Sequence, residues 1–320
     1  MSDAAEPAAD GLRGFWNFGP KDAPVLVENA EAVMPHLPYY LGGWDFQWVG
    51  TAAEGPPDVR IIENCNGEYR VVSNGPGGTD FGFDNPYDAA NGLAGGLISV
   101  HVARNPKMVC INASAARIGG SLVIVIGDPF AGKSSVALHL AVLGHRFFGH
   151  DQIAVTLDQA PVGTCLGLMP KVRLPLPSDC GDAFREFVEG YSAMQGEDMA
   201  YLKLWDGEAG GFGETAPVST LVFLDRRQSG TAELRPASRP EIARKMVSTA
   251  FAPHISYAEL LDGLTCVADS AGTYHLEFSS SREAAALLSG IFYPVLLEIH
   301  LHRLGRLQPC LSVLLLRKHW

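Results

Sequence analysis

The sequence predicts an α/β protein with a mixed sheet and a β-rich N-terminal portion. The apolar run at residues 122–126 has the character of a strand buried on both faces, and a helix over residues 134–143 follows it after a glycine-rich turn. Nearer the N-terminus, residues 59–62 and 69–72 flank Asn66-Gly67, which is the arrangement of a hairpin. Strands that alternate with helices in one part of a chain and follow one another in another part favour a mixed α/β fold.

The remaining elements divide the chain into three expected parts. Residues 1–24 are rich in Ala, Asp, Gly and Pro, and we expect a flexible tail there. A β-rich portion follows over residues 25–105 and ends in a helix at 87–102; within it, Trp44, Phe46 and Trp48 alternate as in a strand that faces the core. Residues 106–320 form the larger core, with a strand at 218–224 and helices at 183–191, 240–250 and 281–288.

Composition excludes several classes of function. The chain has 320 residues, 47% of them hydrophobic and 18% charged, and a net charge of −11 without any Lys/Arg-rich tract, so we expect no nucleic-acid partner. Its six cysteines are scattered and predict neither a zinc site nor a disulfide framework. The N-terminus lacks the features of a secretory signal, and no apolar run reaches the length of a membrane span. We therefore expect a cytoplasmic protein that does not bind membranes.

The strongest motif lies between the strand at 122–126 and the helix that follows it. Residues 127–134, GDPFAGKS, match the P-loop pattern GxxxxGK[ST] at every fixed position. Glycines allow the backbone N–H groups to point at phosphate oxygens, Lys133 supplies a charge for the β- and γ-phosphates, and the Ser134 hydroxyl binds Mg²⁺. No Asn-Lys-x-Asp signature for guanine is visible, so ATP is favoured over GTP. We expect ATP to bind at Gly127, Asp128, Pro129, Phe130, Ala131, Gly132, Lys133, Ser134 and Ser135.

The order of motifs around this loop resembles the HPr kinase/phosphorylase family, whose core is shared with phosphoenolpyruvate carboxykinase. In that family a P-loop and its helix are followed by a Gly-His-Arg turn and then by an Asp-Asp pair. Here Gly144-His145-Arg146 and His150-Asp151 stand at the matching places, and the segments 167–177 and 219–227 are similar to those of the less typical members. The resemblance covers about residues 108–250 and implies a mixed-sheet P-loop kinase core of the HPr kinase/phosphoenolpyruvate carboxykinase type.

The resemblance also implies roles for particular residues. In the family one aspartate accepts the proton of a serine hydroxyl, and the other helps to hold Mg²⁺. Asp151 matches the second aspartate, while His150 stands in place of the first and could accept the proton itself. Asn112 replaces a histidine that the family often carries, and Pro129-Phe130 replaces the usual Ser-Gly. These departures favour a divergent relative, and the change at His150 is compatible with lost activity as well as with a new base.

We therefore predict an ATP-dependent kinase that phosphorylates a hydroxyl, with a serine of a protein or peptide as the acceptor that the resemblance implies. The expected catalytic residues are His150, Asp151, Lys133 and Arg173, and the expected Mg²⁺ ligands are Ser134 and Asp151. Asp225, at the end of the strand 218–224, is a rival for the metal role, and Lys171 and Arg226-Arg227 are further candidates to contact phosphate. A small-molecule kinase and a nucleotide-binding regulator without catalysis are the alternatives, and a homo-oligomer is left open.

Overall fold

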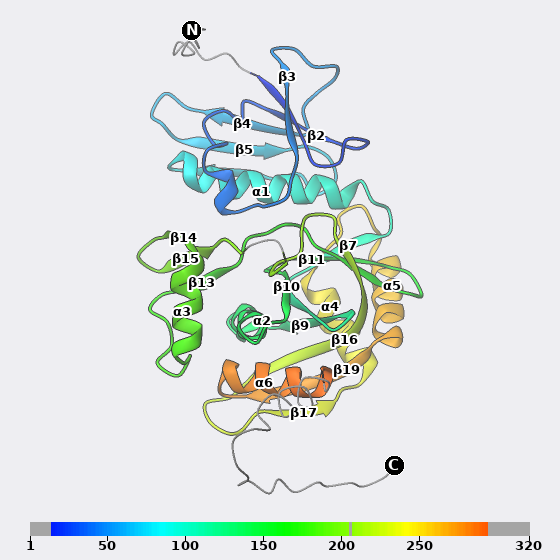
Figure 1. Ribbon diagram of the computed structural model, residues 1–320. Helices are drawn as coiled ribbons and strands as arrows, with labels where there is room; N and C mark the ends of the chain where they lie inside the picture. The colour runs from blue at the N-terminus through cyan, green and yellow to red at the C-terminus, as the bar shows by residue number, and fades with distance from the viewer. Residues whose placement is uncertain (1–13, 205–206, 294–320) are drawn as a thin grey trace, which may run out of the picture.

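The structure is a computed structural model, and it describes residues 14–204 and 207–293. Figure 1 shows two stacked units: a small sheet with helix α1 (Pro86–Ala103) beneath it, and a larger unit in which helices cover both faces of a long sheet. The described chain is thus a mixed α/β protein, as the sequence predicts, with parallel and antiparallel strand pairs in one sheet.

The N-terminal unit is a six-stranded sheet in the order β3-β1-β2-β4-β5-β6. The hairpin around Gly67 is confirmed, because β4 and β5 pair antiparallel and Gly67 adopts the left-handed φ of +82° that the turn requires. Helix α1 packs closely on this sheet, where a Cβ on Gly92 would lie 2.5 Å from the Phe83 ring. The elements of this unit are β1 (Phe15–Phe18), β2 (Val25–Glu28), the short 3₁₀ helix η1 (Leu37–Tyr39), β3 (Phe46–Gly50), β4 (Val59–Glu63), β5 (Tyr69–Ser73) and β6 (Asp80–Phe83).

Two expectations about this unit need correction. The expected tail at residues 1–24 is structured in its described part, because β1 pairs with both β2 and β3. The strand around Phe46 does not face the core: the side chains of Phe46 and Trp48 are exposed, and Trp48 packs edge-on against Trp16 at the surface. Trp44 alone is buried, and its indole N–H donates to the carbonyl of Leu166 in the larger unit.

The larger unit is built on a ten-stranded sheet. Its main path runs β10-β8-β9-β16-β12-β11-β7-β18, and β19 joins β16 on one side and β17 on the other. The strands are β7 (Met108–Ile111), β8 (Ala113–Ile118), β9 (Ser121–Gly127), β10 (Arg146–Gly149), β11 (Ile153–Thr156), β12 (Val162–Thr164), β16 (Thr215–Arg226), β17 (Glu233–Pro236), β18 (Ala250–Phe251) and β19 (Gly272–Phe278).

The central strands of this sheet are buried on both faces. Along β9, Leu122, Ile124 and Ile126 pack toward α4 (Arg239–Thr249) and α5 (Tyr257–Ser270), whereas Val123 and Val125 pack toward α2 (Lys133–Val142) and α6 (Ser281–Phe292). This alternation explains the uninterrupted apolar run in the sequence. Because β9, β16 and β19 are parallel, their carboxyl ends lie at the same edge of the sheet.

A small three-stranded sheet stands beside α2. It contains β13 (Lys171–Arg173), β15 (Met199–Leu202) and β14 (Ser192–Gln195) in that order, and α3 (Asp182–Tyr191) packs on it. The segment 166–169 that leads into β13 also pairs with the N-terminal unit, through Gly42 N–H to Gly167 O at 2.8 Å and Met169 N–H to Tyr40 O at 2.9 Å. The two units therefore share a backbone interface through the segment that leads into β13.

Candidate functional site

The glycine-rich segment 127–134, called the 127–134 loop below, joins the end of β9 to the start of α2. Gly127 ends β9, and Gly132 is the N-cap of α2 with a left-handed φ of +96°. A Cβ at Gly127 would lie 3.0 Å from the Ala131 Cβ and 3.2 Å from the Leu224 Cβ, so a side chain there would require both neighbours to shift. The first turn of α2 contains Lys133, Ser134 and Ser135, and its free N–H groups face this loop.

Lys133 reaches back across the loop. Its ammonium group donates to the carbonyl of Gly127 at 2.9 Å and to that of Asp128 at 3.3 Å. Burial lowers the pKa of Lys133, while the negative charges of Asp151 and Asp128 act in the opposite direction. The charge of Asp151 is therefore close enough to act on the loop lysine, although the two residues belong to different turns.

Asp151 and His150 lie in the turn between β10 and β11. Asp151 has a left-handed φ of +56°, which is uncommon for a residue with a side chain, and its carboxylate pairs with the Lys171 ammonium at 2.8 Å. His150 is 3% exposed, and its Nε2 lies 3.2 Å from Asp151 Oδ2 without hydrogen-bond geometry, so neither ring nitrogen has a hydrogen-bond partner among the described residues. Burial raises the pKa of Asp151, but His150 and Lys171 outweigh it and hold this pKa well below its ordinary value. Asp151 is thus a carboxylate at neutral pH.

Side chains of strand β13 contact both this turn and the 127–134 loop. Lys171 and Arg173 are two residues apart and share one face of the strand, while Val172 between them is buried on the other. Lys171 pairs with Asp151, and the Arg173 guanidinium lies over the Phe130 ring, 4.3 Å from its centroid. Phe130 is 73% exposed and has a left-handed φ of +67°, which presents its ring at the tip of the loop. The sequence proposes both cations as candidates, but it does not show that one pairs with Asp151.

Asp225 and Arg226 end β16, the parallel neighbour of β9. Alternation along this strand places Asp225 on the α4/α5 face and Arg226 on the α2/α6 face. A Cβ added at Gly132 would lie 3.8 Å from Arg226 Nη1, so this guanidinium stands beside the N-terminus of α2. Arg226 is therefore the better placed of the two adjacent arginines to contact a phosphate at the loop.

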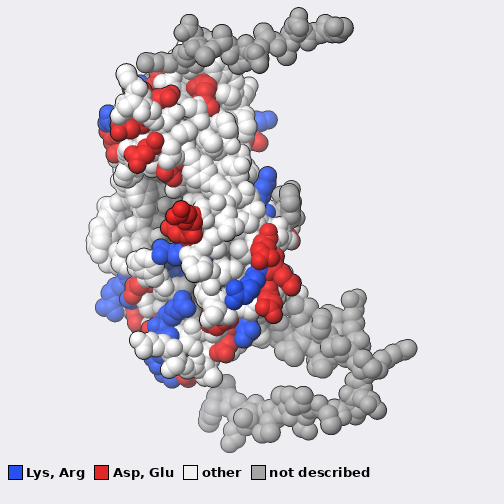
Figure 2. All heavy atoms as spheres, turned by 90° about the vertical axis from the view of Figure 1, so that its left-hand side faces the viewer, with Lys and Arg blue, Asp and Glu red and all other residues white. Residues whose placement is uncertain are grey.

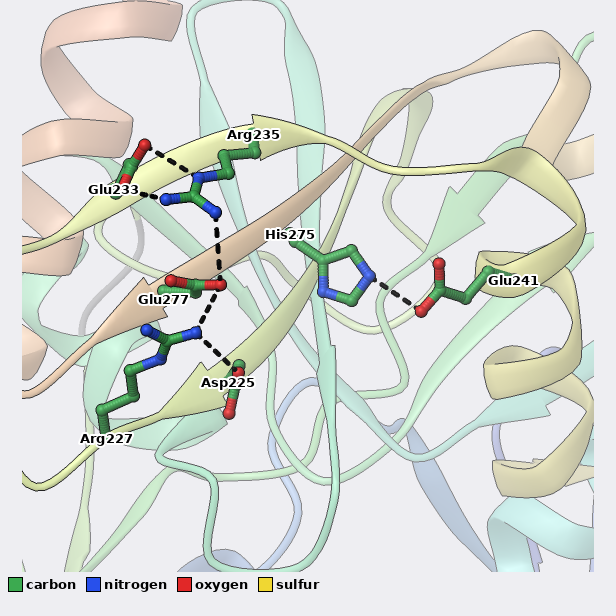
Figure 3. Close-up of polar contacts among 7 residues, drawn as sticks. All are labelled: Asp225, Arg227, Glu233, Arg235, Glu241, His275 and Glu277. Atoms are coloured by element: carbon green, nitrogen blue, oxygen red, sulfur yellow. Dashed lines mark hydrogen bonds and ion pairs between the residues drawn. The ribbon is translucent and has the colours of Figure 1, made fainter.

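Asp225 instead belongs to a network on the opposite face, which Figure 3 shows. Its carboxylate lies 3.7 Å from Arg227, whose closer partner is Glu277 at 2.6 Å, and Arg235 stands on the other side of Glu277 at 3.9 Å. His275 and Glu241 form a separate contact of 2.9 Å nearby. Asp225 also borders the hollow beside the 127–134 loop, so it remains the rival of Asp151.

Basic side chains are frequent around the loop without forming a continuous surface. On the face that carries α3, Lys and Arg lie mainly over the larger unit and alternate with acidic groups, while acidic side chains prevail over the N-terminal unit (Figure 2). An open hollow borders the loop and the end of β16, lined by residues 128–131 and by the charged side chains at the end of that strand. The positive groups nearest the loop are thus individual side chains from β13, α2, β16 and α4, of which Lys245 in α4 lies 3.9 Å from Asp128 Oδ1.

The expected Mg²⁺ ligands are Ser134 and Asp151. Within the described residues, no group of three or more His, Cys, Asp or Glu side chains could hold a metal ion. A Mg²⁺ bound with a triphosphate takes most of its ligands from phosphate and water and needs only one or two from protein. Ser134 in the first turn of α2 and the ionised Asp151 fit that requirement by their chemistry.

Comparison with known proteins gives little further information. No protein-family model matches the sequence, and no curated protein matches it. Among solved structures, the chain is similar to the Hpr(Ser) kinase/phosphatase from Coxiella burnetii, with 13% identity over 60% of this chain and 98% of that one and a TM-score of 0.30. In addition, none of the described helices combines the length and apolar character needed to cross a bilayer.

Proposed function

We propose that this protein is a kinase with a P-loop core of the HPr kinase type, which transfers the γ-phosphoryl group of Mg·ATP to a hydroxyl, in particular to a serine of a protein or peptide. The observation that carries the proposal is the arrangement around β13. One face of this short strand contacts both the 127–134 loop, through Arg173, and the ionised Asp151, through Lys171. These two contacts support a site shared by the 127–134 loop and the His150–Asp151 turn.

The nucleotide phosphates would lie on the 127–134 loop. The N–H groups at the start of α2 and the helix dipole favour negative charge there, and Lys133 supplies a positive group in the same place. Ser134 and Asp151 would hold Mg²⁺, which neutralises phosphate charge when it is bound. Arg226 beside Gly132 and Arg173 above Phe130 can each donate to phosphoryl oxygens through two N–H groups.

His150 is the residue that we propose as the proton acceptor. A ring nitrogen without a hydrogen-bond partner can accept the proton of an acceptor hydroxyl, and the Asp151 carboxylate 3.2 Å from Nε2 would stabilise the resulting positive charge. In the reaction the acceptor oxygen forms a bond to the γ-phosphorus, the bond from that phosphorus to the bridging oxygen of ADP breaks, and the hydroxyl proton moves to His150. Asp151 is less suited to this step, because its pKa is held low.

The test is phosphoryl transfer from γ-labelled Mg·ATP into a cell extract, with Lys133→Met as the variant. We expect the wild type to label protein or peptide and the variant to lose at least about 100-fold of this activity, because the charge on the transferring group loses a positioned cation. Lys107→Ala is the matched control, since Lys107 is an exposed surface lysine paired with Asp158 outside the site.

The outcomes separate the proposal from its rivals. Label in small molecules with none in protein would contradict a serine kinase and favour a small-molecule kinase. Binding of ATP by the wild type without transfer into any fraction would contradict catalysis altogether and favour a nucleotide-binding regulator.

A further inference from the structure

A groove of about 390 Å³ lies where the two units meet, next to the candidate catalytic turn. The N-terminal unit contributes α1 and β6 to its walls, and the larger unit contributes Phe251 of β18, Tyr201 of β15 and the His150–Asp151 turn. No residue of the 127–134 loop borders it. The groove is therefore distinct from the expected nucleotide site, and it borders the candidate catalytic turn.

One wall of the groove is a flank of α1 that includes three glycines, Gly92, Gly95 and Gly96. Asn91, Gly95 and Ser99 repeat at intervals of four residues, so they lie along one face of the helix, with Gly92 beside them. A Cβ built at Gly95 meets no atom within 4 Å, which shows that the space above this turn of the helix is open. Glycine within a helix costs stability relative to alanine, and packing within the protein does not require it at Gly95.

The inner end of the groove has a buried polar group whose contacts are incomplete. His150 borders it and is 3% exposed; its Nε2 lies 3.2 Å from Asp151 Oδ2 without hydrogen-bond geometry, and its Nδ1 has no hydrogen-bond partner among the described residues. A buried polar side chain without a partner is costly, and such groups are typical of sites that receive a ligand. Asp151 and Lys171 border the same end.

A second wall of the groove comes from an edge strand, β6, which packs beside α1. β6 is the last strand in the described part of the N-terminal sheet, so one of its edges has no strand partner there. Phe81 and Phe83 project from β6 on the side of the groove, and Phe81 is 56% exposed. An unpaired edge next to apolar side chains is the arrangement by which sheets bind extended peptides.

We propose that this groove binds the acceptor as an extended peptide, paired with the edge of β6, with a bulky apolar side chain over Gly95 and a serine hydroxyl directed at His150 and Asp151. The inference rests on the proposed function and adds its substrate class, a serine in an extended segment flanked by an apolar residue. In an extended segment, side chains two positions apart point the same way. The apolar residue that shares the groove with the serine is therefore expected two positions from it.

The first experiment uses a positional library of blocked heptapeptides with a fixed central serine. We expect transfer of label from Mg·ATP to favour Leu or Phe over Asp two positions from the serine by about tenfold or more, the range over which apolar pockets discriminate. A single N-methyl group beside the serine, which removes one backbone donor, should lower the transfer to the best peptide.

The second experiment fills the groove. Gly95→Leu places a side chain in the open space without a clash at Cβ, so the variant should fold at least as well as the wild type while its KM for the best peptide rises about tenfold. Gly190→Leu is the matched control, because Gly190 is also a helical glycine with open space around it, in α3, and does not border the groove. The KM for ATP should remain unchanged in both variants.

Distinct results overturn the two proposals. Efficient transfer to peptides that shows no apolar preference, or that Gly95→Leu leaves unchanged, would overturn the peptide groove and leave the kinase standing. Label confined to small molecules would overturn the peptide as occupant. ATP binding without transfer to any acceptor would overturn the proposed function itself.

Discussion

Replacing Asp151 by asparagine tests the assignment of the carboxylate that acts with the 127–134 loop. Asparagine has the same shape and tolerates the left-handed φ of +56° at this position, so the backbone of the turn should persist. The change removes one negative charge close to Lys133 and His150 and leaves the residues of the loop intact. Its effect should therefore appear in catalysis and not in folding.

The expected loss of stability and the expected loss of catalytic rate differ enough to be measured separately. The ion pair with Lys171 spans 2.8 Å, but its side chains are 38% and 32% exposed, so solvent screens it and its loss should cost no more than about 1 kcal/mol of unfolding free energy. A group that stabilises a proton acceptor and holds Mg²⁺ contributes about 100-fold or more to the rate, which is about 3 kcal/mol in the barrier. We expect kcat to fall at least 100-fold while the thermal midpoint falls by about 3 °C or less.

Asp225→Asn provides the matched comparison. Asp225 lies 3.7 Å from Arg227, which keeps Glu277 as its closer partner at 2.6 Å, so the rate should change less than tenfold. For both variants, the rate of label transfer from Mg·ATP and the thermal midpoint of unfolding are measured. If Asp225→Asn lost as much activity as Asp151→Asn or more, the metal role would pass to Asp225 and the reasoning from β13 would be wrong.

Two further perturbations test the surroundings of the loop. Burial and the charge of Arg282 lower the pKa of His139 to about 4, against a raising effect of Asp179, whereas in the unfolded chain its pKa is near the ordinary value of 6.5. Because the unfolded chain then binds the proton first, unfolding free energy should fall by up to about 3 kcal/mol between pH 6.5 and 4, and urea titrations of His139→Gln should show a flatter dependence. Separately, Arg226→Met should raise the Kd for ATP about tenfold by isothermal titration, while Arg227→Met should change it less than threefold; equal effects would contradict the placement of Arg226 beside Gly132.

The core elements were predictable because they rest on local pattern. The continuous apolar run of β9, the hairpin turn at Gly67 and the helix after the glycine-rich loop all follow from chain-local sterics and periodicity. The exposure of Phe46 and Trp48 did not follow, because strand alternation does not say which face is covered. The strand β1 was missed because its short aromatic sequence is surrounded by a composition typical of tails.

The site was only partly predictable for a related reason. The loop residues are contiguous, so the motif gives all of them together. The pairing of Lys171 with Asp151 joins strand β13 of the small sheet to the turn between β10 and β11, and the sequence contains only a weak signal for it, the spacing of Lys171 and Arg173 at i and i+2. Arg226 lies beside the 127–134 loop and Arg227 beside Glu277 because they occupy opposite faces at the end of β16. The sequence does not say which face is which, because this depends on the strands that flank β16.

The backbone itself links the two halves of the site. Among the described non-glycine residues, left-handed φ values occur at Asn29, Phe130 and Asp151, and the last two lie at opposite ends of the contacts made by β13. Each such conformation costs about 1 kcal/mol or more and persists only where the surroundings enforce it. Two contacts can enforce these conformations: the Arg173 guanidinium lies over the ring of Phe130, and the Lys171 ammonium pairs with the carboxylate of Asp151. Contacts from one short strand thus reach both strained turns, and they would keep the 127–134 loop and the His150–Asp151 turn in a fixed relation before any ligand binds.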